Sequence, residues 1–198
     1  MNQKKMLKLF SCMAVLIFLC LSGSPTYATE EESAPEIISV GMNLPQITLD
    51  APASKKDKEY LSLKTGEPFS LSQIPAKLIV LEIFSVYCPH CRMQAPKLNK
   101  VYKLIQLDME LSPDIKMIGI AALDDQNKTD KWKTTLHVPF PLFADLNADI
   151  WGKFGKPGVP YTLLISNSGK VLSTNSGVTE DTDDFFRHLK NVFRAVEK

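Results

Sequence analysis

Two cysteines three positions apart, Cys88 and Cys91, are the residues of this chain best suited to chemistry, because thiols at this spacing can open and close a disulfide. Pro89 follows the first cysteine, and proline is favoured at the first position of a helix. We therefore expect a helix to begin here with Cys88 at its N-terminus. Unpaired backbone N–H groups and the helix dipole at that end favour a thiolate over a thiol.

The spacing also predicts a division of roles between the two thiols. Cys88 is expected to be the exposed nucleophile, and Cys91 is expected to face inward and to attack a mixed disulfide on Cys88, which releases the partner. His90 lies between the cysteines, where it can donate a hydrogen bond or carry a positive charge near the sulfur. We assign Cys88, Pro89, His90 and Cys91 to the catalytic site.

A buried strand must lead into this site. Residues 77–86 form a nearly unbroken apolar run rich in branched side chains, which is typical of a strand covered on both faces. Glu82 interrupts that run, and its neighbours on the same strand face, Val80 and Phe84, are apolar. Burial there should raise the pKa of the Glu82 carboxyl and allow it to take the proton of Cys91. The alternative is a glutamate near the strand end that reaches solvent.

The remaining pattern predicts an α/β domain with a central mixed sheet flanked by helices. The helix after the cysteines should run over residues 89–111 with a kink at Pro96. Other expected elements are a strand after Pro45, a charged loop over 54–59, a hairpin of 60–63 with 68–71, a strand over 115–123, helices over 129–137 and 147–154, a hairpin of 161–166 with 170–174, and a helix from 182 onward.

The N-terminal segment has the pattern of a secretory signal peptide, with three lysines followed by an apolar run over residues 9–21. We expect residues 1–28 to be cleaved after Ala28, residues 29–39 to form a flexible acidic leader, and residues 40–198 to form one domain in the periplasm or cell envelope. An uncleaved membrane anchor and a lipoprotein attached at Cys20 are alternatives. Cleavage would leave Cys88 and Cys91 as the two cysteines of the exported protein.

Composition excludes several classes of partner. The formal net charge is +1, and without the three lysines of the signal segment 20 basic residues remain against 22 acidic ones. No basic stripe interleaved with aromatic residues is present, so we expect no nucleic-acid surface. The sequence also has no phosphate-binding glycine loop and no dinucleotide fingerprint. We expect no cofactor beyond the redox-active disulfide of Cys88 and Cys91.

The chain resembles the thioredoxin superfamily, and within it the exported redoxin branch of TlpA/ResA-like proteins. The resemblance implies a thioredoxin-like fold with an N-terminal β extension and an inserted strand-helix unit. It also implies that Pro160 is in the cis form facing the cysteines and that Val159 pairs with substrate backbone, so Val159 and Pro160 are candidate substrate-binding residues. Tyr87, which directly precedes Cys88, is a further candidate for substrate binding. The resemblance rests on Gly41 to Pro45, Cys88-Pro89-His90-Cys91, Pro96, Gly158 to Thr162, and the turn from Ser166 to Lys170.

The active-site motif differs from that branch, because Cys-Pro-His-Cys after Glu-Ile-Phe-Ser-Val-Tyr is similar to the site of DsbA-type disulfide oxidants. The scaffold indicates a reductant and the motif an oxidant, so the direction of exchange stays open. In either direction the resemblance implies cysteine-containing exported proteins as partners, such as apocytochrome c, together with a membrane redox partner that recycles the dithiol.

The two cysteines are also compatible in part with three other kinds of site. A zinc site needs four ligands, and the mature chain adds only His90, His137 and His188 to the two thiols. An exported copper carrier remains open because soft thiolates suit Cu(I). A peroxiredoxin-like peroxidase also remains open, although Leu81 stands where such sites have a proline and Cys91 would be an unusual neighbour.

Overall fold

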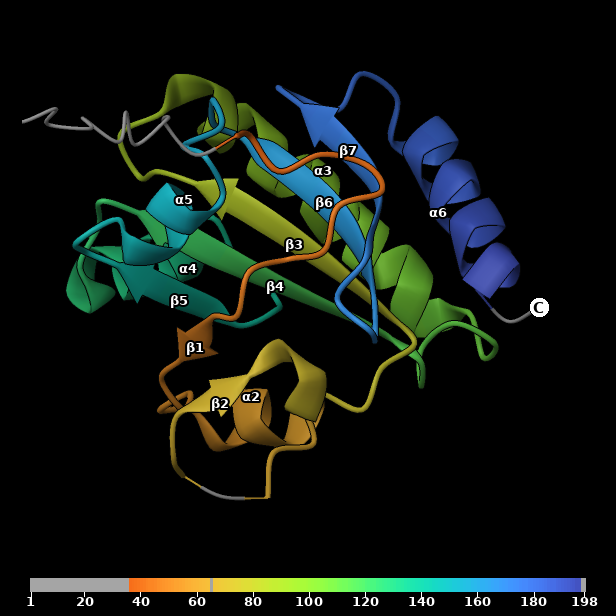
Figure 1. The fold of residues 1–198 in the computed structure, drawn as a ribbon, viewed down its shortest axis with the longest axis horizontal. Coiled ribbons are helices and arrows are strands. Elements are labelled where there is room, and N and C mark those ends of the chain that lie inside the picture. Colours follow the sequence, from red (N-terminus) through yellow and green to blue (C-terminus); the bar gives the residue numbers. More distant parts are fainter. Residues whose placement is uncertain (1–35, 65, 197–198) are drawn as a thin grey trace, which may run out of the picture. The chain divides into compact units, whose positions relative to one another are not determined.

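A five-stranded sheet forms the centre of the computed structural model, which describes residues 36–64 and 66–196 (Figure 1). The strand order is β5-β4-β3-β6-β7. β3, β4 and β5 are parallel, whereas β6 is antiparallel to β3 and β7 is antiparallel to β6, so the prediction of a mixed sheet is confirmed. The strands are β3 (Leu78–Phe84), β4 (Ile115–Ala122), β5 (Leu142–Asp145), β6 (Tyr161–Ser166) and β7 (Val171–Ser176).

The central strand β3 is buried along its whole length, as the nearly unbroken apolar run predicted. Ile79, Leu81 and Ile83 point into the core on one face of the sheet. Val80 and Phe84 point into the core on the other face. Side chains alternate along a strand, so only a strand covered on both faces needs apolar residues at nearly every position.

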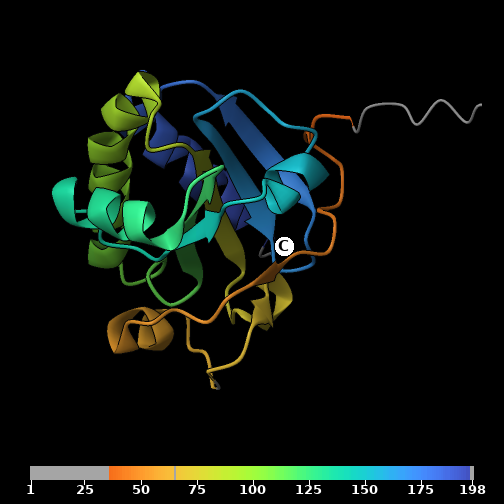
Figure 2. The ribbon, with the colours of Figure 1, turned by 90° about the vertical axis from the view of Figure 1, so that its left-hand side faces the viewer.

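Helices cover both faces of the sheet. α3 (Pro89–Leu107), α4 (Gln126–Thr135) and α6 (Thr182–Val196) contribute apolar side chains to the core on the face of Phe84. α5 (Asp149–Lys153) contributes to the opposite core, and Figure 2 shows it across the sheet from α3 and α4. Flanking helices on a mixed sheet are the architecture that the sequence predicted.

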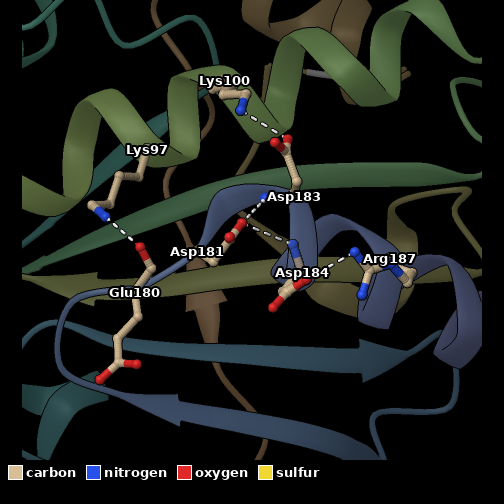
Figure 3. Close-up of polar contacts among 7 residues, drawn as sticks. All are labelled: Lys97, Lys100, Glu180, Asp181, Asp183, Asp184 and Arg187. Carbon is tan, nitrogen blue, oxygen red and sulfur yellow. Dashed lines mark hydrogen bonds and ion pairs between the residues drawn. The ribbon is translucent and has the colours of Figure 1, made fainter.

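Polar contacts join the start of α6 to α3 (Figure 3). Asp181 lies just before α6 and accepts a hydrogen bond of 2.7 Å from the backbone N–H of Asp183, which satisfies one free N–H of the first turn. The ammonium group of Lys100 lies 2.8 Å from the Asp183 carboxylate, and that of Lys97 donates to the carbonyl of Glu180 at 2.9 Å. These exposed contacts surround a buried pair, Gln94 and Thr179, that belongs to the site described below.

The prediction of a charged loop over residues 54–59 is wrong. Residues Lys55–Tyr60 form helix α2, and the Ser54 side chain accepts a hydrogen bond of 3.4 Å from the N–H of Asp57. Asp57 also forms an ion pair with Lys133 of α4. The charges that suggested a loop therefore belong to a short helix, with Lys55, Lys56 and Glu59 exposed, and a cap and a tertiary ion pair stabilise it.

The predicted hairpin of residues 60–63 with 68–71 is also wrong. β2 (Phe69–Ser70) pairs instead with β1 (Thr48–Leu49), which lies before α2 in the chain. A short 3-10 helix, η1 (Leu71–Gln73), follows β2 and leads toward β3. The N-terminal β extension is thus a two-stranded sheet whose strands are separated in the chain by helix α2. Local turn signals could not reveal that pairing.

Helix boundaries differ from the predicted ones by a few residues. α3 passes through Pro96 and ends at Leu107, four residues earlier than expected. α4 begins three residues earlier than expected, because the Asp125 carboxylate accepts a 2.9 Å hydrogen bond from the N–H of Lys128 and caps it. α5 lies within the predicted range of 147–154.

An extended segment of residues 36–47 lies on the side of the sheet that carries α5 (Figure 2). Ile38 is buried, its N–H donates to the carbonyl of Phe154 at 3.0 Å, and its carbonyl accepts from the Tyr161 hydroxyl at 2.8 Å. Gly155 has a φ of +75°, and a Cβ there would lie 2.3 Å from the carbonyl oxygen of Glu36, so only glycine fits.

The predicted signal peptide, residues 1–28, and most of the predicted leader lie outside the described residues. Within the described part, none of the helices has the length and apolar character needed to cross a membrane.

Candidate active site

Cys88 is the N-cap residue of α3, at the position that Pro89 predicted. Its Sγ accepts a hydrogen bond of 3.3 Å from the backbone N–H of Cys91, one of the N–H groups that a helix leaves free at its start. Cys88 is partly exposed and Cys91 is buried, and both are free thiols. The structure therefore places one accessible and one sheltered sulfur at the end of the same helix.

The loop before β6 faces the first cysteine across 71 positions of sequence. The Cys88 thiol lies 3.5 Å from the carbonyl oxygen of Val159, and the peptide bond between Val159 and Pro160 is cis. The carbonyl of Pro160 accepts a 2.9 Å hydrogen bond from the N–H of Gly177. The structure thus brings together the cysteines and the two loop residues that the family resemblance assigned to substrate binding.

Burial is the main influence on the pKa of the Cys91 thiol. It raises the pKa of the Cys91 thiol above its ordinary range, and the hydrogen bond with Cys88 and the nearby charge of Glu82 raise it further. Cys91 is therefore a neutral thiol near neutral pH. Because the thiolate is the attacking form, a thiol in this state needs a base close by before it can attack a disulfide.

Glu82 is buried on β3, with 6% of its surface exposed, which excludes the alternative of a glutamate reaching solvent. Burial raises the pKa of its carboxyl to about 8. Its direct neighbours in the sheet are Gly119 of β4 and Thr162 of β6, and the Thr162 hydroxyl is buried without a hydrogen-bond partner in the described part of the chain. A proton-carrying carboxyl thus lies on the sheet face that α3 covers.

An aspartate that the sequence analysis did not single out holds the loop before Cys88. Asp124 is fully buried, and its Oδ2 accepts a 2.9 Å hydrogen bond from the N–H of Val86, whereas its Oδ1 has no partner in the described part. Ser85 completes the turn, because its carbonyl accepts from the N–H of Cys88 at 3.1 Å. The position of Asp124 just after a buried strand, at the same sheet edge as the cysteines, was the signal that could have identified it.

A hydrogen-bonded pair of side chain and loop residue, which the sequence did not indicate, connects α3 with the loop before α6. The Gln94 side chain donates to the Thr179 hydroxyl at 3.0 Å and accepts from the Thr179 N–H at 2.8 Å, and both residues are buried. Gln94 lies one turn after Cys91, and Thr179 lies two residues after Gly177, which holds the Pro160 carbonyl. The pair therefore links the cysteine helix to the support of the cis-proline loop.

The other predicted site residues are at the surface. His90 and Pro89 are exposed, and among the described residues the His90 ring makes no hydrogen bond. Tyr87 is 71% exposed, and the ammonium group of Lys128 lies 5.6 Å from the centre of its ring. In the described ranges, no three His, Cys, Asp or Glu side chains are grouped so as to hold a metal ion.

Residues 40–174 match the model of the AhpC/TSA family, a span that includes β1 through most of β7, both cysteines, Glu82 and the cis-proline loop. The chain belongs to the AhpC/TSA family.

Several relatives of this AhpC/TSA chain carry the name of a thiol-disulfide oxidoreductase or interchange protein. The thiol-disulfide oxidoreductase ResA of Bacillus subtilis is 20% identical over 194 residues, which cover 98% of both chains. The thiol:disulfide interchange protein DsbE of Yersinia pestis is 25% identical over 154 residues, covering 77% of this chain and 72% of DsbE. The predicted relationship to ResA-like redoxins is confirmed, and the predicted class, thiol-disulfide oxidoreductase, is the class that these relatives carry.

Solved structures show the same fold. A thioredoxin-family thiol:disulfide interchange protein from Chlorobium tepidum matches with a TM-score of 0.56 at 20% identity, covering 80% of this chain and 99% of its own. A secreted disulfide oxidoreductase of Mycobacterium tuberculosis matches with a TM-score of 0.53 at 22% identity, covering 76% and 96%. The predicted thioredoxin-like fold of this AhpC/TSA chain is therefore confirmed.

Proposed function

We propose that this protein exchanges disulfides with cysteine-containing exported proteins through the Cys88/Cys91 dithiol. The observation that carries the proposal is the position of the Cys88 sulfur, which lies at the start of α3 within 3.3 Å of the Cys91 N–H and 3.5 Å from the Val159 carbonyl. A sulfur so placed can accept negative charge from the helix end while a partner chain lies against the cis-proline loop.

The reaction proceeds in two exchanges. The Cys88 thiolate attacks one sulfur of a partner disulfide, the S–S bond of the partner breaks, and its second sulfur leaves as a thiolate. Cys91 then loses its proton and attacks Cys88, which forms the Cys88–Cys91 disulfide and releases the first partner sulfur. The partner gains two electrons and the dithiol loses two; the same steps in reverse donate a disulfide.

Glu82 is proposed to take the proton of Cys91 in the second exchange. Its pKa of about 8 lets a fraction of the carboxyls be ionised at neutral pH, and its burial keeps other proton acceptors away. His90 is proposed to tune the stability of the Cys88 thiolate from the exposed side. Val159, Pro160 and Tyr87 are proposed to bind the partner's backbone and side chains.

Export is part of the proposal. Residues 1–28 would direct the chain out of the cytoplasm, residues 29–39 would connect it to the domain of residues 40–198, and a membrane redox partner would recycle the dithiol. The mass of the protein recovered from the cell envelope tests this, because cleavage after Ala28 gives a chain that begins at Thr29.

Trapping of mixed disulfides tests the exchange itself. A Cys91→Ser variant lacks the resolving thiol, so it should accumulate covalent complexes with envelope proteins that a reductant releases. The matched control is the Cys88→Ser variant, which lacks the nucleophile and should trap none. Absence of such complexes with Cys91→Ser, in a strain that produces the folded variant, would contradict the proposal.

A further inference from the structure

A hollow beside Cys88 combines an apolar lining with positive charge. It measures about 310 Å³, and its lining includes Val86, Tyr87 and Trp132 together with Arg92, Lys128 and Lys131. A second hollow of about 340 Å³ shares Val86, Tyr87 and Arg92 with the first and extends to Cys88 itself. The two form one continuous surface that runs from the nucleophilic sulfur to the cations on α4.

Two of the three cations of this surface, Arg92 and Lys128, lie against aromatic rings. The Arg92 guanidinium lies 5.2 Å from the ring centre of Trp132, which is buried and stacks on Phe84 at 5.5 Å. The Lys128 ammonium group lies over the Tyr87 ring at 5.6 Å. Contacts of this kind reduce the freedom of long side chains, so the positive charge is positioned before any partner arrives.

Acidic residues neutralise only one of the three positive charges of this surface, that of Lys128. No Asp or Glu lines either hollow. Lys128 shares its charge with Asp125 at 3.1 Å, but Arg92 and Lys131, both exposed, have no ion-pair partner among the described residues. Two positive charges beside the nucleophile are therefore available to a ligand.

We infer that the polypeptide segment exchanging disulfides with Cys88 is extended and carries an acidic side chain two residues from its reactive cysteine, with that carboxylate against Arg92 and Lys131. Arg92 follows Cys88 by four residues, about 6 Å along the helix axis, and two residues of an extended chain span about 6.6 Å. The planar guanidinium matches a carboxylate in shape and charge. The inference rests on the proposed exchange at Cys88 and specifies the substrate that the site prefers.

Three short peptides test the inference. Each peptide has a single cysteine and is used as its symmetrical disulfide. The three peptides differ at one position only, two residues from the cysteine, which is Glu, Gln or Lys. The initial rate of exchange with the reduced protein is measured at low ionic strength. The Glu peptide should react about three to five times faster than the Gln peptide, the size expected for an exposed ion pair, and the Lys peptide should react slowest. The ratio of the Glu-peptide rate to the Gln-peptide rate should approach one in 1 M salt, because salt screens the charges.

Two charge reversals locate the effect. In Lys131→Glu the ratio of the Glu rate to the Gln rate should fall to one or below. Lys103→Glu is the matched control, because Lys103 is an exposed lysine without an ion-pair partner in the described part, on α3 about 16 Å along the axis from Arg92. This control should keep the wild-type ratio.

The outcomes separate the inference from the proposed function. Equal rates for the three peptides at low salt, or a preference for the Lys peptide, would overturn the inference while the exchange stands. A Lys131→Glu variant that keeps the wild-type ratio would also overturn it. Failure of the protein to react with any peptide would refute the proposed exchange as well.

Discussion

Replacement of Glu82 by Gln should change how the stability of the protein depends on pH. Burial raises the pKa of the Glu82 carboxyl from an ordinary 4.5 to about 8, so the folded protein holds this proton over a pH range in which the unfolded chain has released it. Because the folded state binds more protons between pH 4.5 and pH 8, this group destabilises the fold progressively as pH rises through that range. A neutral glutamine of similar shape lacks the effect.

The expected size follows from the two pKa values. At pH 5 ionisation of Glu82 in the unfolded state lowers the free energy of unfolding by less than about 1 kcal/mol, and at pH 8 by about 4 kcal/mol. The difference in unfolding free energy between Glu82→Gln and wild type should therefore increase by roughly 3–4 kcal/mol from pH 5 to pH 8, in favour of the variant. Other titrating groups largely cancel because they are common to both proteins.

Urea unfolding of the reduced proteins at several pH values measures this difference. Glu67→Gln is the control, because Glu67 is exposed and its replacement should leave the pH dependence of the wild type unchanged. If the Glu82→Gln and wild-type stabilities keep a constant difference from pH 5 to pH 8, the carboxyl is not held protonated by burial, and its proposed role as the proton acceptor for Cys91 fails with it.

Three further substitutions test the supports of the site. Asp124→Ala leaves the partly buried N–H of Val86 without its acceptor and should cost about 1–3 kcal/mol of stability while slowing disulfide exchange, measured by urea unfolding and by insulin reduction. Gln94→Leu removes both bonds to Thr179 and should cost at least about 2 kcal/mol in the same unfolding assay; a loss within error would show that the pair is not a structural link. Lys100→Ala breaks only an exposed ion pair and should change stability by less than about 1 kcal/mol.

The cysteine end of the fold was predictable because its signals are local. A nearly unbroken apolar run is typical of a strand buried on both faces, and β3 is buried at every position. Proline after the first cysteine fixes the start of α3, so the placement of Cys88 and Cys91 followed directly. Glu82 was identifiable because its side chain interrupts an apolar strand face at a position that must be buried.

The N-terminal part was not predictable from local signals. Six residues with five charges suggested a loop, but α2 is stabilised by an ion pair between Asp57 and Lys133, which lie 76 positions apart. The pairing of β1 with β2 likewise joins segments on either side of α2. Both features depend on long-range contacts that no periodicity in the sequence encodes.

The polar supports of the site were missed for a related reason. Asp124 and Gln94 are the residue types usually found at the surface, and only the folded chain shows them buried against Val86 and Thr179. Their partners are 38 and 85 positions away in sequence, so neither pair forms a local motif. The cationic surface beside Cys88 arises in the same way, from residues of α3 and α4.

The redox equilibrium of the Cys88/Cys91 pair tests the central claim most directly. The purified protein is equilibrated in glutathione buffers of increasing oxidation, quenched with acid, alkylated and weighed by mass spectrometry. We predict one reversible two-electron transition between the dithiol and an intramolecular Cys88–Cys91 disulfide. A midpoint near about −180 mV or higher indicates a disulfide donor, and one near about −270 mV indicates a reductant. If no intramolecular disulfide forms at any glutathione ratio, the dithiol mechanism is contradicted.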